Sequence, residues 1–205
     1  MRANEEEAMR RYEALLEELE AERRRLMSHP GYVGCRENCD TCCRGTSLLS
    51  ILPVEMIHMK QGLLKLPPEL REYIYDRARR AILKALSLGY DAGKLMEGKA
   101  GEAMMKMRGG EAVCPFLIGG VCAIYDQRPL ICRIWGLPMF DGLRTSCCKY
   151  TFVGNLDALK PIDYTYFRRE AIRIGEESGC GRGSIPMSYA ILIIKAEEEV
   201  EREGA

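Results

Sequence analysis

Four cysteines crowd into the nine residues from Cys35 to Cys43, which read Cys-Arg-Glu-Asn-Cys-Asp-Thr-Cys-Cys. Thiols at this density pack poorly but are good ligands for soft metals, and the polar residues between them favour turns that wrap a backbone around an ion. Cys39 and Cys42 form a C-x2-C pair, whose spacing lets both sulfurs converge on one metal. Cys43 follows directly, and neighbouring side chains of an extended chain point in different directions. Either the loop is tightly turned there, or Cys42 and Cys43 serve two metal centres.

A second group of cysteines follows later in the chain. Cys114 and Cys122 flank the pair Gly119-Gly120, which can adopt the positive φ angles of a tight turn, so a hairpin is predicted to bring the two thiols together. Eight thiols would suit two four-cysteine sites or one multinuclear cluster, with either member of the 147–148 doublet as the eighth ligand. The predicted ligands are Cys35, Cys39, Cys42, Cys43, Cys114, Cys122, Cys132, Cys147 and Cys148. Cys180 has no nearby partner in the sequence and is expected to be an ordinary packed thiol.

The composition narrows the classes of function. Thirty basic residues balance thirty acidic ones, and no basic stretch is rich in aromatic residues, so nucleic acid is disfavoured as a partner. The charged N-terminus lacks the apolar core of a signal peptide, and no later stretch approaches ~18 uncharged apolar residues, which predicts a soluble cytoplasmic protein without a membrane partner. Because cytoplasmic thiols are kept reduced, ten cysteines indicate metal or redox chemistry rather than a disulfide scaffold.

Helical periodicity dominates the chain outside the cysteine motifs. Apolar residues at three-and-four spacing predict a long amphipathic helix within residues 1–30, which either packs on its own domain or forms a homodimer through a coiled coil. Residues 46–52 are predicted to be a short strand or extended connection. Residues 91–110, rich in glycine and methionine, are expected to form short helices and a mobile loop. Further helices are predicted over residues 53–62, 69–88, 163–177 and 187–203.

We therefore expect a mainly α protein: a helical domain with a small β-hairpin and metal clusters held by cysteine-bearing loops. Its predicted parts are an N-terminal amphipathic helix at residues 1–30, a metal-binding domain at residues 31–150, and C-terminal helices at residues 151–205 that pack on the same domain. No repeat or low-complexity linker divides the chain.

Several motifs combine into a recognisable set. They are Cys35-x3-Cys39-x2-Cys42-Cys43-Arg44, Cys114-Pro-Phe-Leu, Cys122-x-Ile-Tyr-x-x-Arg128-Pro129 and Cys132-Arg133. Together they resemble the YkgJ-type cysteine-cluster family, described as a zinc- or iron-chelating domain, over about residues 35–148. The resemblance implies a metal-binding domain with the seven cysteines from Cys35 to Cys132 at motif positions, and a later cysteine as well. This chain has three residues between its first two cysteines where many members have two.

The ligand set bears on the identity of the metal. Zinc uses histidine freely, yet His29 and His58 lie outside the motifs, so the candidate ligands are all thiolates. Adjacent cysteines in such numbers favour an iron–sulfur cluster, most readily 4Fe-4S, with Zn2+ as the alternative. Arg128, Arg133 and Tyr125 would then donate hydrogen bonds or positive charge to the cluster. An ion pair with Asp126 is an alternative role for Arg128.

Three functions stay open on these grounds. The first is electron transfer or cluster handling with a protein partner, either a redox protein or a client. The second is a zinc-binding structural or interaction protein. The third is an iron–sulfur-dependent protein-modifying enzyme of the methyl-transfer type, or its accessory subunit, by analogy with a similar cysteine-cluster domain associated with flagellin lysine methylases. The first three cysteines also match the spacing of radical S-adenosylmethionine enzymes, but the chain lacks the alternating strands and helices of their barrel.

Overall fold

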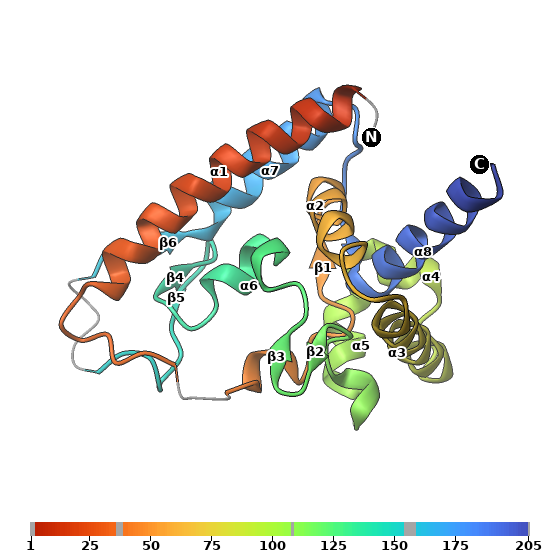
Figure 1. The fold of residues 1–205 in the computed structure, drawn as a ribbon. Coiled ribbons are helices and arrows are strands. Elements are labelled where there is room, and N and C mark those ends of the chain that lie inside the picture. The colour runs from red at the N-terminus through yellow and green to blue at the C-terminus, as the bar shows by residue number, and fades with distance from the viewer. Residues whose placement is uncertain (1–2, 36–38, 108, 154–158, 205) are drawn as a thin grey trace. The chain divides into compact units, whose positions relative to one another are not determined.

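The computed structural model describes residues 3–35, 39–107, 109–153 and 159–204. It is mainly helical with small two- and three-stranded sheets, which confirms the predicted fold class (Figure 1). The chain forms two compact units. Unit 1 comprises Met1–Cys39 and Arg128–Arg182, and unit 2 comprises Asp40–Gln127 and Gly183–Ala205. None of the described helices is long and apolar enough to cross a membrane.

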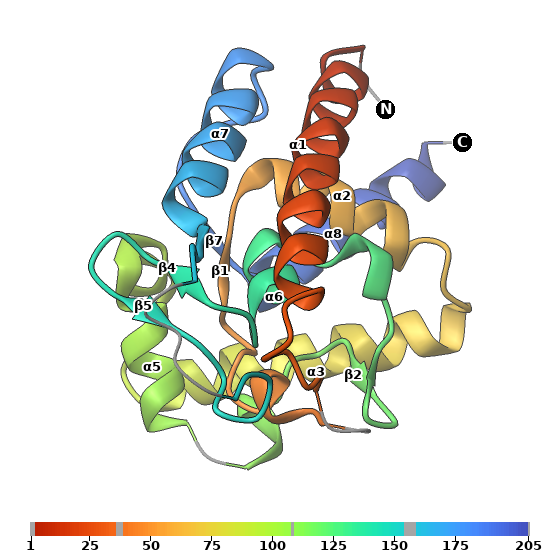
Figure 2. The same ribbon diagram turned by 90° about the vertical axis from the view of Figure 1, so that its left-hand side faces the viewer.

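Unit 1 is built on two helices that lie side by side, α1 (Ala3–Met27) and α7 (Tyr164–Glu177) (Figures 1 and 2). Their apolar stripes face each other because both helices repeat apolar residues at three-and-four spacing. Tyr12 and Leu19 of α1 and Phe167 and Ile174 of α7 are buried there. The predicted N-terminal helix thus packs within its own unit.

A short helix and a small sheet complete unit 1. The helix is α6 (Leu130–Ile134), which begins directly after Pro129. Strand β4 pairs antiparallel with β5 and parallel with β6, giving the order β5-β4-β6. The strands are β4 (Met139–Phe140), β5 (Thr145–Ser146) and β6 (Ile162–Asp163).

Unit 2 is organised around three helices, α2 (Pro53–Leu63), α3 (Pro68–Ser87) and α8 (Met187–Glu203). Their bounds agree with the predicted helices to within a residue or two, since each begins at or beside a proline that suits a first helical turn. Ile74 and Ala78 of α3 pack with Ile191 and Ile194 of α8 in one apolar core. At the surface, Lys60 of α2 reaches α8, with its Nζ atom 2.9 Å from Glu197 and 3.2 Å from Glu201.

Residues 92–106 and 110–112 of unit 2 form short helices, and several of their side chains are part of a core. The expected short helices are present, and Leu95, Ala103 and Met107 are buried in that core, while the mobility expected of this stretch stays a prediction. Met107 fills core space, as methionine at helical spacing commonly does. The elements are α4 (Ala92–Lys94), η2 (Leu95–Lys99), α5 (Ala100–Lys106) and η3 (Gly110–Ala112).

Two small antiparallel pairs of strands complete unit 2. Strand β1 (Ser50–Ile51) pairs with β7 (Ile185–Pro186), which precedes α8 directly. Strand β2 (Leu117–Ile118) pairs with β3 (Val121–Cys122). Gly119 and Gly120 link the latter two at φ angles of 57° and 85°, which confirms the predicted hairpin, because both positions need the left-handed conformation that glycine adopts without strain.

Candidate metal centre

The hairpin of unit 2 brings three predicted ligands together: Cys43, Cys114 and Cys122, hereafter the three-thiol cluster. The N–H of Cys114 donates to the carbonyl of Cys43 over 2.7 Å, which ties the first cysteine loop to the start of the hairpin. Cys122 lies opposite Leu117 in the strand pairing, and the N–H of Leu117 in turn donates to the carbonyl of Cys114 over 3.1 Å. All three cysteines pack against the core that contains Phe116.

Cys114 is the most buried member of this cluster, with 7% of its surface exposed. Its Sγ atom lies 3.7 Å from the Sδ atom of Met187 at the start of α8. Burial raises the pKa of the Cys114 thiol to about 12, and the neighbouring Cys122 and Cys43 sulfurs add to the increase. Because the thiolate is the form that binds a metal, binding at Cys114 would displace a proton.

The doublet Cys42-Cys43 lies in a tight turn, the 3-10 helix η1 (Thr41–Cys43). The turn closes through the N–H of Cys43, which donates to the carbonyl of Asp40 over 2.8 Å. An ion pair of 2.6 Å between Arg44 and Asp40 spans the same turn. As a result Cys42 is exposed whereas Cys43 packs on the core. The tightly turned loop was one of the two predicted arrangements.

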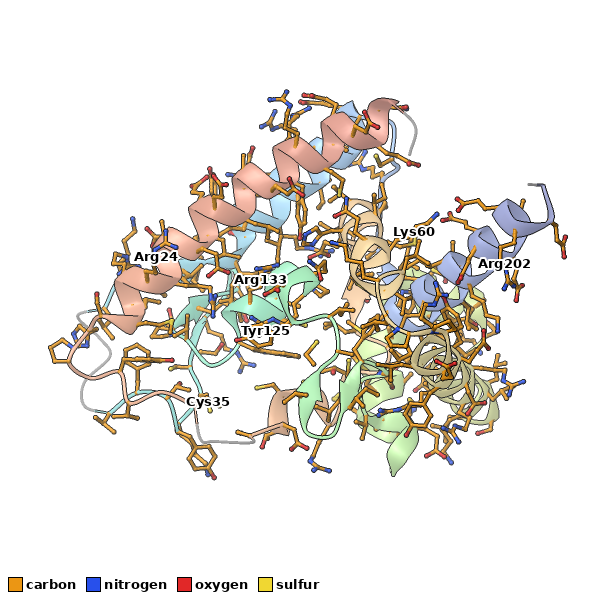
Figure 3. All side chains as sticks on the ribbon, in the orientation of Figure 1. Arg24, Cys35, Lys60, Tyr125, Arg133 and Arg202 are labelled. Atoms are coloured by element: carbon orange, nitrogen blue, oxygen red, sulfur yellow. The ribbon has the colours of Figure 1, made fainter. Side chains whose placement is uncertain are left out.

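Apart from Cys42, the other predicted ligands belong to unit 1. Cys132 is half-buried on α6, and Cys35 is exposed on the loop after α1, as Figure 3 shows. Cys39 is half-buried at the boundary of unit 1. Cys147 and Cys148 follow strand β5. The ten cysteines, all within the described residues, are present as thiols.

Cys147 has a defined polar environment. Its thiol donates to the carbonyl of Gly136 over 3.4 Å, and its Sγ atom lies 3.8 Å from Oγ1 of Thr151. Burial raises the pKa of this thiol, and the charge of Cys148 adds to the effect. Both members of the doublet are half-buried, so their exposure does not distinguish the predicted eighth ligand.

Among residues 3–35, 39–107, 109–153 and 159–204, no three histidine, cysteine, aspartate or glutamate side chains converge closely enough to hold a metal ion. The donor chemistry of the three-thiol cluster nevertheless fits a soft metal, since it offers three sulfurs, with the Met187 thioether beside them. Metal binding would therefore require these side chains to change rotamer and converge, which a short loop and a hairpin permit more readily than a helix interior does.

Arg133, one of the two predicted arginines, has clear partners in unit 1. Arg133 is 8% exposed; its Nε atom donates to the carbonyl of Arg128 over 2.9 Å, and its Nη1 atom lies 3.1 Å from the carboxylate of Glu20. Glu20 also accepts from Arg23 of the same helix. These contacts fasten α6 to α1. Tyr125 starts the short helix η4 (Tyr125–Gln127) of unit 2 and is exposed (Figure 3).

Sequence reasoning missed two residues beside the three-thiol cluster, Met187 and Arg77. Arg77 of α3 donates through Nη1 to the carbonyl of Leu117 over 2.5 Å, and its positive charge acts to lower the pKa of Cys114 against the effect of burial. The local sequence does not predict that either residue lies beside the cluster, because both reach the hairpin only through the packing of α3 and α8.

The two histidines stand on elements other than those that carry Cys43, Cys114 and Cys122. His29 follows α1 in unit 1, where its Nδ1 atom accepts from the N–H of Gly31 over 3.0 Å and its ring packs near Phe152. His58 is buried on α2 of unit 2. The candidate donors of the three-thiol cluster are thus sulfur atoms.

Comparison with known proteins gave no relative. No protein-family model matches this chain, and neither a curated protein nor a solved structure does. The resemblance to the YkgJ-type family therefore stays a prediction from the motifs.

Proposed function

We propose that this protein is a cysteine-based metal-binding protein that holds an iron–sulfur cluster for electron transfer or cluster handling. The observation that supports the proposal is the three-thiol cluster of unit 2. Cys43 and Cys114 come from segments far apart in the sequence, yet a 2.7 Å backbone hydrogen bond joins them on one apolar core. Thiols gathered in this way are soft ligands in a partly buried environment, as thiolate-ligated metals require.

Each member of the three-thiol cluster would have a distinct role. Cys114, buried beside Met187, would hold the metal on the apolar side and shield it from water. Cys43 and Cys122 are half-buried and would close the site towards the solvent. A bound iron–sulfur cluster would supply one-electron chemistry at this position. The guanidinium of Arg77 lies near enough to offset part of the negative charge that thiolates bring.

Iron is favoured over zinc by the ligand chemistry alone. Zinc sites draw on histidine as readily as on cysteine, and both histidines of this chain lie outside the cysteine motifs in the sequence. A zinc-binding structural protein is the alternative, since zinc also accepts ligand sets made of thiolates alone. Either metal would release protons on binding, because the ligands start as thiols.

The test is a metal and acid-labile sulfide analysis, with an absorption spectrum, of protein purified without oxygen. We expect iron and sulfide together with a broad band in the visible. Zinc without sulfide would replace the iron–sulfur proposal by the zinc alternative. The absence of any bound metal, after reconstitution with iron and sulfide and separately with zinc, would refute metal binding altogether.

A variant series assigns the metal to the three-thiol cluster. Cys122→Ser and Cys114→Ser are expected to lose most of the metal, whereas Cys180→Ser in unit 1 is expected to retain it. Circular dichroism of each apoprotein shows whether the variant is folded. Cys122 is the more informative position because it is half-buried, so serine is easily accommodated there. Full metal content in both cluster variants would exclude this site.

A further inference from the structure

A cavity of about 320 Å³ lies on the surface of unit 2, between α3 and the segment that leads into the hairpin. Its volume is at the lower end of the range typical of small-molecule sites. The residues that line it are Tyr73, Arg77, Arg80, Gly110, Glu111 and Val113. Val113 directly precedes Cys114 and Arg77 is bonded to the hairpin, so the cavity adjoins the three-thiol cluster without including its sulfurs.

One wall of the cavity is positively charged and aromatic. Tyr73, Arg77 and Arg80 stand on one face of α3, because residues four and then three positions apart fall on the same side of a helix. The Arg77 guanidinium lies 5.7 Å from the centre of the Tyr73 ring. Arg77 uses Nη1 for the carbonyl of Leu117, and Arg80 pairs with Asp76 over 3.1 Å. A guanidinium has five N–H donors, so both arginines keep donors for a ligand.

Glu111, in the 3-10 helix η3, lines the cavity from a second element. Glu111 is half-buried, and among the described residues its carboxylate has no ion-pair partner. The cavity is thus lined by two arginines from α3 and by a glutamate from η3. A plain anion would meet repulsion from Glu111, whereas a ligand with both charges would satisfy the arginines and the glutamate.

We propose that this cavity binds a small zwitterion of amino-acid type, with its carboxylate on Arg77 and Arg80 and its ammonium group on Glu111. The half-exposed Tyr73 ring supplies an apolar surface for the rest of the molecule. Arginine matches a carboxylate through two parallel hydrogen bonds, and a carboxylate accepts from an ammonium group in turn. This site rests on its own residues and does not depend on metal binding by the thiols.

The first experiment measures binding of the standard amino acids, each at millimolar concentration, to the full-length protein by ligand-observed NMR. The tightest binder is then compared with its N-acetylated form, which lacks the ammonium group, and with its decarboxylated amine. We expect each analogue to bind at least about tenfold more weakly, since each loses one charge-assisted pair. The proposal is overturned if no amino acid binds, or if the N-acetylated form binds as tightly as its parent.

A matched set of variants then tests the location. Arg80→Gln and Glu111→Gln are expected to weaken binding at least about tenfold. Arg79→Gln is the control, because Arg79 is a neighbour on the same helix, is exposed and does not line the cavity. Arg77 is left intact because it also holds the hairpin. Equal affinities of Arg80→Gln, Glu111→Gln and Arg79→Gln would exclude this cavity as the site.

Discussion

Removal of the Tyr75 hydroxyl tests how unit 2 holds α8 against α3. Tyr75 is 3% exposed, and its hydroxyl donates to Oε2 of Glu198 over 2.8 Å. The other carboxylate oxygen of Glu198 lies 2.8 Å from Nη1 of Arg71. Replacement of Tyr75 by phenylalanine keeps the buried ring and removes only the hydrogen bond. The substitution therefore isolates one polar contact between the two helices.

The size of the effect follows from the charge of the acceptor. A hydrogen bond to a charged group contributes about 1.5–3 kcal/mol to stability. In the variant, Glu198 retains its ion pair with Arg71. Its carboxylate is also partly accessible to water, and a hydrogen bond from water can compensate for part of the lost free energy. We therefore expect Tyr75→Phe to lower the free energy of unfolding by about 1.5 kcal/mol, at the lower end of that range.

The dependence on pH has a defined sign. Burial raises the pKa of Tyr75, and the hydrogen bond and charge of Glu198 raise it further. The folded state thus holds the phenolic proton more tightly than the unfolded chain does. This contribution to stability is present below pH ~10, the ordinary pKa of tyrosine, and is lost as the pH rises above it. The parent protein should consequently lose stability above pH ~10 more steeply than Tyr75→Phe.

The assay is urea unfolding followed by far-ultraviolet circular dichroism, with hydrogen exchange of the α8 peptides as a readout specific to unit 2. Tyr73→Phe is the matched control, because Tyr73 lies on the same helix with half of its surface exposed. We expect no change in stability for the control. Equal stabilities of Tyr75→Phe, Tyr73→Phe and the parent would refute the role assigned to this hydrogen bond.

Three further predictions concern packing, a helix start and a thiol. Ile191→Ala, at a fully buried position of α8, should cost about 2–5 kcal/mol in urea unfolding, whereas the partly exposed Ile193→Ala should cost far less. Glu55→Ala should lower the free energy of unfolding by about 1.5–3 kcal/mol, because the Glu55 carboxylate accepts a buried 2.6 Å hydrogen bond from the backbone N–H of Leu52, just before α2. Glu55→Gln, which keeps an acceptor oxygen, should lose less stability. Burial raises the pKa of Cys180, and the charge of Glu5 raises it further. At pH ~8 iodoacetamide should therefore label Cys180 more slowly than an unperturbed thiol, and Glu5→Gln should increase the labelling rate. Equal labelling rates in the parent and in Glu5→Gln would contradict the role of Glu5.

The sequence by itself determined the local elements. The helices of unit 2 begin at prolines and repeat apolar residues with helical period, and both signals act over one or two turns. The hairpin follows in the same way from Gly119-Gly120, whose φ angles suit a tight turn between short strands. The thiol pair of Cys114 and Cys122 was therefore predictable, because the turn alone places the two arms together.

Only the tertiary structure decided what surrounds those thiols. Cys43 reaches Cys114 through a backbone hydrogen bond between distant segments, and Met187 arrives with α8. Arg77 and Glu111 line one cavity although they lie on separate elements. Such contacts depend on which faces of the helices pack together. The apolar periodicity of a helix does not specify them, because many different side chains can occupy the same positions of that pattern. Local patterns thus specify where helices and turns form, while the packing of the core selects which functional groups become neighbours.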